Sequence, residues 1–111
     1  MAKKLKVYMS CGNVFKDLGL PNPERIMARA QIMDRITEII QERILTQKQT
    51  AKILGIPQSK VSCLMNGKLH MFSLDHLFEL LNKLDKSVHI FIKPKAKGEK
   101  TATTHVHMKA A

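Results

Sequence analysis

Apolar residues recur at every third or fourth position in the first strongly patterned stretch of the chain. This spacing gathers side chains on one face of a helix, and it holds for Ile26, Ala30, Met33, Ile36 and Ile40. Asn22 and Pro23 predict where the helix begins, because an Asn side chain can accept hydrogen bonds from the first free amides and proline suits the first helical position. We expect the helix to end near Arg43.

Residues that are typical of helix ends predict two further helices. Thr46 and Gln49 have the spacing of a capping box, in which each side chain satisfies the backbone amide of the other residue. This helix should run to Leu54, where Gly55 can break it. A third helix follows from residue 57 or 58 to about residue 66, and Gly67 supplies a left-handed end.

A fourth helix is predicted from Leu74 to about residue 84, with Ser73 as its N-terminal cap and Asp75 in its first turn. Its apolar face suits either a core or a dimer seam and consists of Leu77, Leu80, Leu81 and Leu84. These signals together predict four helices between residues 22 and 84.

Two segments alternate with a period of two, which is the spacing of a strand. Val88, Ile90 and Ile92 fall on one face of residues 87–93, which Pro94 ends, and residues 3–9 alternate over a shorter run. An isolated strand leaves its amides and carbonyls unpaired. The two segments therefore pair within one chain, or the C-terminal strands of two copies pair across a two-fold axis, which is the arrangement we expect.

The net charge of the chain indicates which class of molecule it binds. The chain has 111 residues and a formal net charge of +10, which suits one domain and favours a polyanionic partner, with nucleic acid first and a membrane surface second. The alternative is that the charge only aids solubility. We expect an N-terminal arm over residues 1–21, a domain over 22–93, and a flexible basic tail over 94–111 that either grasps DNA or only solubilises the chain.

Several function classes are not indicated. Cys11 and Cys63 are too few for a disulfide framework and fit a reduced, cytoplasmic setting. Residues 1–10 contain no apolar run long enough for a signal peptide, and no segment is long enough to span a bilayer. His105 and His107 are too few for a structural metal site. His70, His76 and His89 are scattered and have no nucleophile or acidic partner at a suggestive spacing, and no nucleotide-binding glycine pattern occurs. We therefore expect no enzyme, no cofactor and no membrane partner.

The informative segment is residues 46–68, TQKQTAKILGIPQSKVSCLMNGK. Ala51 is small where two helices must approach closely, and Gly55 can take the positive φ of a tight turn between them. The second helix can pack back on the first through Ile56, Val61 and Leu64. Its outward positions are polar: Gln58, Ser59, Lys60 and Ser62. Such a face is either simply solvated or fits the DNA major groove, where side chains read base edges.

At these residues the chain resembles the DNA-binding domain of the phage-repressor or Cro class, the XRE family. The shared pattern is Thr46, Gln47, Ala51, Leu54, Gly55, Ile56, Gln58, Val61, Ser62, Leu64, Asn66, Gly67 and Lys68. Residues 12–15, 17–21 and 72–74 resemble, more narrowly, small XRE regulators of which many are antitoxins encoded beside a ribonuclease toxin. The resemblance covers residues 12–93 and implies a mainly α, lambda-repressor-like bundle of four to five helices with a short C-terminal β-strand used for dimerisation.

The resemblance also implies DNA-contacting residues at matching positions. On the recognition helix these are Gln58, which can pair with adenine, Lys60, which can reach guanine or phosphate, and their outward neighbours Ser59, Ser62 and Cys63. Elsewhere they are Gln47 at a helix N-terminus facing phosphate, Asn66 and Lys68 in a backbone-contacting loop, and the flanking cations Lys48 and Lys52.

Two positions depart from the family pattern. Ile44 stands where relatives often have a glycine that ends the first helix, and because a β-branched residue resists the left-handed conformation, we expect that helix to end differently. Cys63 stands where relatives often have a polar or basic residue. Since a thiol is a poor hydrogen-bond donor, we expect apolar readout there, toward a thymine methyl group.

The sequence thus predicts a sequence-specific repressor that binds double-stranded DNA as a homodimer on a palindromic operator and represses its own operon. The narrower resemblance adds an antitoxin role with a ribonuclease toxin as partner. Two alternatives stay open. One is a basic protein that binds nucleic acid without sequence preference, and the other is an antitoxin that acts mainly by protein–protein inhibition.

Overall fold

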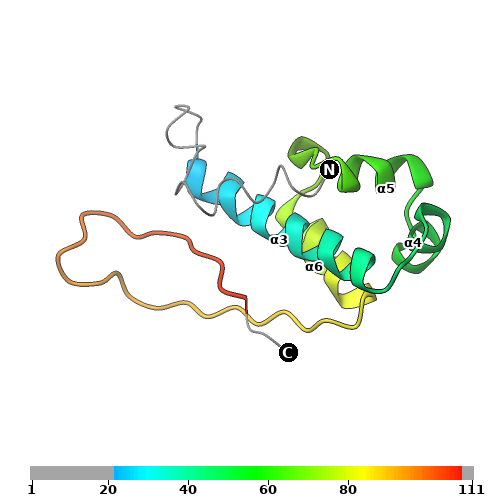
Figure 1. Cartoon of the computed structure of the whole chain (residues 1–111). Coiled ribbons are helices and arrows are strands. Elements are labelled where there is room, and N and C mark those ends of the chain that lie inside the picture. Colours follow the sequence, from blue (N-terminus) through cyan, green and yellow to red (C-terminus); the bar gives the residue numbers. More distant parts are fainter. Residues whose placement is uncertain (1–21, 109–111) are drawn as a thin grey trace.

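The computed structural model describes residues 22–108, in which the helices lie between residues 23 and 83 and the chain beyond them is irregular (Figure 1). The elements are α3 (Pro23–Glu42), α4 (Gln47–Leu54), α5 (Gln58–Met65), the 3-10 turn η2 (Leu69–Met71) and α6 (Leu74–Lys83). Each predicted helix is confirmed to within about two residues at its ends. The predicted arm over 1–21 and the possible strand over 3–9 lie outside the described residues.

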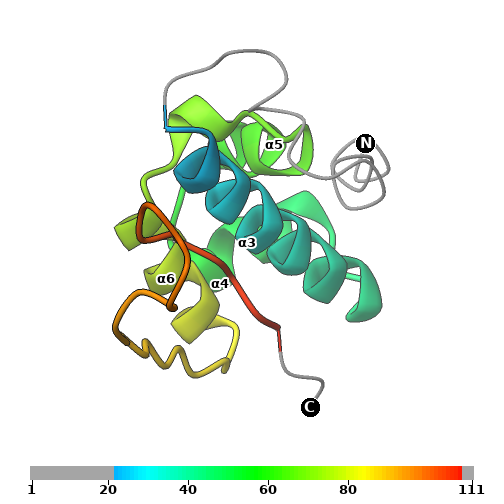
Figure 2. The ribbon, with the colours of Figure 1, turned by 90° about the vertical axis from the view of Figure 1, so that its left-hand side faces the viewer.

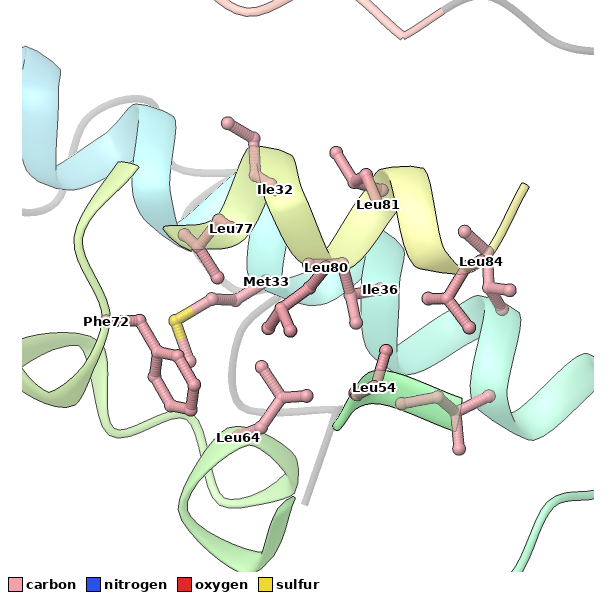
Figure 3. Close-up of a cluster of buried hydrophobic side chains, with 12 residues drawn as sticks. Ile32, Met33, Ile36, Leu54, Leu64, Phe72, Leu77, Leu80, Leu81 and Leu84 are labelled. Atoms are coloured by element: carbon pink, nitrogen blue, oxygen red, sulfur yellow. The ribbon is translucent and has the colours of Figure 1, made fainter. Parts of the chain in front are cut away.

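The core forms where α3 and α6 lie side by side and α4 and α5 close over one end (Figures 1 and 2). Met33, Ile36 and Leu80 are fully buried there, and Leu54 of α4 and Leu64 of α5 point toward them (Figure 3). Each such aliphatic side chain contributes about 1.5–3 kcal/mol when it leaves water. The aliphatic core therefore fixes α4 and α5 against the α3–α6 pair.

The start of α3 differs from the prediction. Pro23 occupies the first turn as expected, but Asn22 has a left-handed backbone (φ 51°) and its side chain makes no capping hydrogen bond. Its carbonyl oxygen instead accepts from the amides of Arg25 and Ile26 at 3.1 and 3.2 Å. The predicted side-chain cap was therefore wrong, because a left-handed entry turns the Asn22 side chain away from those amides.

The other two predicted caps are confirmed. The Gln49 amide donates to Thr46 Oγ1 at 3.1 Å and the Thr46 amide donates to Gln49 Oε1 at 2.9 Å, which completes the capping box. The His76 amide donates to Ser73 Oγ at 3.1 Å. Both helices thus begin with orphan amides satisfied by side chains close in sequence.

All four of these helices end in the same way, at a residue with positive φ. The values are 53° at Ile44, 68° at Gly55, 70° at Gly67 and 63° at Asp85. In each case the amide of the following residue donates back across the last turn, at 3.2 Å for Leu45 to Ile40 and 3.0 Å for Lys68 to Cys63. This Schellman arrangement satisfies carbonyls that the helix leaves free.

Ile44 therefore corrects the expectation that α3 would end differently. It takes the left-handed conformation that a glycine would adopt easily, at a cost of about 1–2 kcal/mol. Its side chain is 86% exposed, so burial does not offset that strain. Neighbouring contacts offset this strain, because Leu45 packs against the core and α4 begins directly afterwards with Thr46 as its N-cap.

The predicted C-terminal strand is not present in the described part of the chain. Residues 87–108 are irregular, and within residues 22–108 the backbone of 87–93 forms no hydrogen bond. A strand requires a partner segment, and no second strand is found between residues 22 and 108. The chain beyond residue 100 nevertheless contacts the helices, because the Thr104 amide donates to Glu24 Oε2 at 2.8 Å and Val106 packs against the core.

Candidate nucleic-acid interface

The turn between α4 and α5 is built as the sequence predicted. Gly55 has φ 68° and ends α4, and Val61 and Leu64 are fully buried where α5 packs back on α4. A Cβ added at Gly55 would lie 3.1 Å from Lys83 Nζ, so the position is limited by space as well as by backbone angle. The two helices therefore pack against each other through buried side chains on either side of a tight turn.

Two cationic side chains stabilise helix C-termini within the fold, so their charge is not available to an outer binding surface. Lys83 Nζ donates to the carbonyl of Leu54, the last residue of α4, at 2.9 Å and pairs with Glu79 at 3.3 Å. Arg43 Nη2 donates to the Leu84 carbonyl at the end of α6 at 2.6 Å. Helix C-termini carry a partial negative charge that cations stabilise. Neither role was predicted from the sequence, because each cation binds the end of a helix that is distant from it along the chain.

A third cation fixes the loop that follows α5. Arg29 Nη1 lies 3.5 Å from the Leu69 carbonyl and 3.4 Å from the Phe72 carbonyl. These bonds tie η2 to α3 across about forty residues of sequence. The loop between α5 and α6, which contains Lys68, is thereby anchored to the longest helix.

The outward side of α5 is polar and small. Gln58 and Ser59 are exposed, and Ser62 is half-buried on the side opposite Val61 and Leu64. Asn66 is exposed at the end of the helix, where its Nδ2 donates to the Ser62 carbonyl at 2.9 Å. The structure thus brings the predicted residues Gln58, Ser59, Ser62 and Asn66 together on one helix and its end, where side chains near an N-terminus can reach base edges.

Lys60 and Cys63 lie closer to the protein than the sequence suggested. Lys60 Nζ stands 5.4 Å from the centre of the buried Phe72 ring, on which His76 also stacks at 5.6 Å. A cation over an aromatic face gains about 0.5–1 kcal/mol at an exposed site, so Lys60 gives up that contact if it extends to guanine. Cys63 is half-buried and packs against the core.

The remaining predicted residues flank α5. Gln47 and Lys48 are exposed in the first turn of α4, Lys52 is exposed near its end, and Lys68 is exposed in the loop after α5. Gln49 is occupied in the capping box, which leaves Gln47 and Lys48 free of that role. These polar and basic side chains are therefore accessible on the elements that precede and follow α5.

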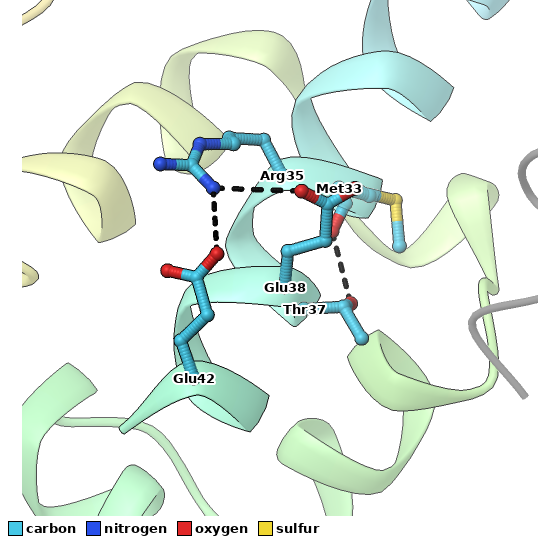
Figure 4. A network of polar contacts seen from close by, with 5 residues as sticks. All are labelled: Met33, Arg35, Thr37, Glu38 and Glu42. Atoms are coloured by element: carbon cyan, nitrogen blue, oxygen red, sulfur yellow. Dashed lines mark hydrogen bonds and ion pairs between the residues drawn. The ribbon is translucent and has the colours of Figure 1, made fainter. Parts of the chain in front are cut away.

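Charge is distributed unevenly along the fold. Residues 44–74 contain no Asp or Glu but carry four lysines: Lys48, Lys52, Lys60 and Lys68. Helix α3 is mixed instead, and its Arg35 lies 3.4 Å from both Glu38 and Glu42 (Figure 4). Because uncompensated lysines release counterions from DNA and paired ones do not, α4 and α5 form the part of the helical body suited to a polyanion.

Between residues 22 and 108, no group of three or more His, Cys, Asp or Glu side chains is placed to hold a metal ion, and the rings of His105 and His107 are 6.4 Å apart. None of the helices in that range has the length and apolar character needed to cross a membrane.

Two short helices joined by a tight glycine turn, with the second presenting a polar outer face, define a helix-turn-helix protein. A family described as "Helix-turn-helix domain" matches residues 14–93, which is more than half of the chain. The chain therefore belongs to this family, and the match of a solved structure described as a candidate XRE family transcriptional regulator supports the XRE type.

That solved structure superimposes with a TM-score of 0.75 at 35% sequence identity. The match covers 80% of this chain and 100% of the other. No curated protein gives a significant match to the sequence.

Proposed function

We propose that this protein is a transcriptional regulator that binds specific double-stranded DNA with α5 in the major groove and acts as a repressor. The observation that carries the proposal is the polar outer face of α5 inside an acid-free stretch, residues 44–74. Family membership and the similarity to a candidate transcriptional regulator support it. The predominance of lysine around a polar reading face suits binding that combines phosphate attraction with base contacts.

Residue roles follow from position on the two helices. Gln58 and Ser59, exposed at the start of α5, read base edges, and a Gln side chain can bond adenine through two atoms. Ser62 and Cys63 are short, which lets the helix backbone come close to the bases. Gln47, Lys48, Asn66 and Lys68 contact phosphates. Because Lys60 rests on Phe72, we assign it a phosphate contact rather than a guanine contact.

The test is binding to DNA from the promoter upstream of the protein's own gene, measured by fluorescence anisotropy in about 0.15 M salt. A scrambled duplex of the same length is the control DNA. We expect the promoter to bind more tightly and Gln58→Ala to remove about 1–3 kcal/mol of that preference. Gln41→Ala is the matched control variant, because Gln41 is an exposed glutamine on α3 and should leave both affinities unchanged.

Equal binding to the two duplexes, with a steep loss as salt rises, would instead identify a basic protein that binds nucleic acid without sequence preference. A clear preference that Gln58→Ala leaves intact would contradict the assignment of α5 as the reading helix, while keeping the repressor function.

We also propose that the regulator acts as a homodimer on a palindromic operator in its own promoter. A single α5 reads only a few base pairs, and two copies related by a two-fold axis read two half-sites about one helical turn apart. Footprinting on the promoter should therefore give two protected half-sites with this spacing. One protected half-site without a symmetric mate would contradict the palindrome.

An antitoxin role is a second proposal and rests on the resemblance of residues 72–74 and the upstream segment to small antitoxins. Such a protein neutralises a ribonuclease toxin encoded beside it. A net charge of +10 gives no attraction toward a basic toxin, so the contact would depend on apolar surface. Co-expression with the neighbouring gene product and recovery of a complex tests the role, and a product that never co-purifies contradicts it.

A further inference from the structure

Phe72 is a core residue whose ring also meets a cation of the reading helix. It is 1% exposed and belongs to the buried cluster, where it lies beside Met33 at the end of the core toward α5 (Figure 3). Lys60 Nζ, from α5, stands 5.4 Å from the centre of that ring. The ring therefore connects the core to a long cationic side chain on the helix that we assign to the major groove.

Phe72 is held in place by contacts from three elements. Its carbonyl accepts from Arg29 Nη1 of α3 at 3.4 Å, and its amide donates to the carbonyl of Leu69 in η2 at 3.2 Å. The ring of His76, in the first turn of α6, stacks on the Phe72 ring with 5.6 Å between centres and 26° between planes. Because the backbone and the ring of Phe72 are both fixed, the contact with Lys60 is broken by motion of the lysine and not of the ring.

The contact distinguishes Lys60 from the other lysines around α4 and α5. Lys60 is half-buried, whereas Lys48, Lys52 and Lys68 are exposed. A lysine on a solvated helix face moves among several staggered rotamers. The aromatic face favours those rotamers that keep Nζ over the ring, because the ring carries negative charge density on its face. The direction of the Lys60 side chain is therefore restrained, while the exposed lysines keep their freedom.

This restraint has a consequence for base recognition. A lysine reads guanine only when its ammonium group reaches O6 or N7 at the base edge in the major groove. A cation over an aromatic face is favoured about two- to fivefold over the released side chain at an exposed site. A side chain that must leave the ring before it binds loses that factor in apparent affinity for the base. The ring thereby weakens guanine recognition by Lys60 by about the same factor.

We propose that Phe72 determines part of the DNA specificity of the regulator: it holds Lys60 on its ring and away from base edges, so that the base pair beneath Lys60 is bound without a preference for guanine. Because Phe72 is 1% exposed, it acts through Lys60 and does not itself touch DNA, which makes it a positioning residue. The inference rests on the proposed function and on α5 as the reading helix. Base readout then comes from the exposed Gln58 and Ser59.

The test is a set of binding titrations with promoter duplexes that each carry one base-pair substitution. Phe72→Leu removes the ring and keeps an apolar side chain in the core. We expect it to gain a preference for guanine of about two- to fivefold at one position and to leave the others unchanged. The double variant Phe72→Leu with Lys60→Met should lose that gain. Phe78→Leu is the matched control, because Phe78 is a half-buried phenylalanine of α6 with no lysine over its ring among the described residues.

A measurement on the wild-type protein makes the test independent of the stability of Phe72→Leu. Protons above an aromatic face resonate upfield of their usual NMR position, because the ring current opposes the applied field there. We expect the ε-methylene protons of Lys60 to be shifted upfield in the unbound protein and to stay so in the promoter complex. Lys68, which is exposed in the loop after α5, should show no such shift in the unbound protein.

Failure of this inference is distinguishable from failure of the proposed function. Loss of the upfield shift of Lys60 in the promoter complex would overturn the inference, and so would a folded Phe72→Leu protein with the base preferences of the wild type. Both results leave the proposed function intact if the wild type still prefers the promoter over the scramble. A wild type that binds the two duplexes equally would overturn the proposed function itself, whatever the NMR shift of Lys60.

Discussion

The α4–α5 pair and residues 87–93 carry equally clear sequence patterns but differ in what completes them. The pair contains its own capping box, glycine turn and buried contacts, all within residues 46–68. Residues 87–93 alternate regularly, yet the hydrogen bonds of a strand must come from a different segment. A helix is specified by local sequence, whereas a strand is specified only together with its partner. The variants below test that difference, from the largest expected effect to the smallest.

Leu64→Ala should have the largest effect, because it removes a fully buried side chain between α5 and the core. We expect a loss of about 2–5 kcal/mol in the free energy of unfolding, measured by urea denaturation. Ile92→Ala is the matched variant in the C-terminal segment and should cost little in dilute protein. Equal losses at both sites would contradict the contrast between the two regions.

Gly55→Ala should cost about 1–2 kcal/mol, because alanine resists the left-handed conformation and its Cβ would approach Lys83 Nζ. Thermal unfolding followed by circular dichroism measures this loss. Gly98 also has positive φ but has nothing within 4 Å of an added Cβ, so Gly98→Ala isolates the backbone strain from the crowding. A Gly55→Ala protein as stable as the wild type would show that the turn tolerates another geometry.

Lys83→Met should show that some cations stabilise the fold and do not contribute to DNA binding. It removes the hydrogen bond to the Leu54 carbonyl at the end of α4, and we expect a loss of about 1 kcal/mol in stability with an unchanged salt dependence of DNA binding. Lys48→Met should do the reverse, leaving stability unchanged and lowering the slope of log affinity against log salt by about 1. If both variants change the same quantity, the division of cations into two roles is wrong.

Much of the fold and part of the site could be predicted because their signals are local. Thr46, Gly55 and Ser73 mark helix ends through neighbours a few residues away, and the structure confirms each. The contacts that escaped prediction span long stretches of sequence: Lys60 meets Phe72 across twelve positions, and Arg43 meets Leu84 across forty-one. No periodicity encodes such pairs, because they arise only when α3, α5 and α6 have packed.

At Ile44, tertiary packing overrides the local preference of a β-branched residue against the left-handed conformation. Replacing Ile44 should have the smallest effect among the four sets of variants predicted here. Relief of the left-handed strain favours Ile44→Gly by about 1–2 kcal/mol, while the greater freedom of glycine in the unfolded chain costs about 0.5–1 kcal/mol. Since the side chain is 86% exposed, little burial is lost. We therefore expect a net gain of about 0.5–1 kcal/mol in thermal unfolding, with DNA affinity unchanged. Ile44→Ala, which keeps a Cβ at the strained position, should give no comparable gain, and a loss of stability in Ile44→Gly would mean that the isoleucine side chain contributes a contact in solution.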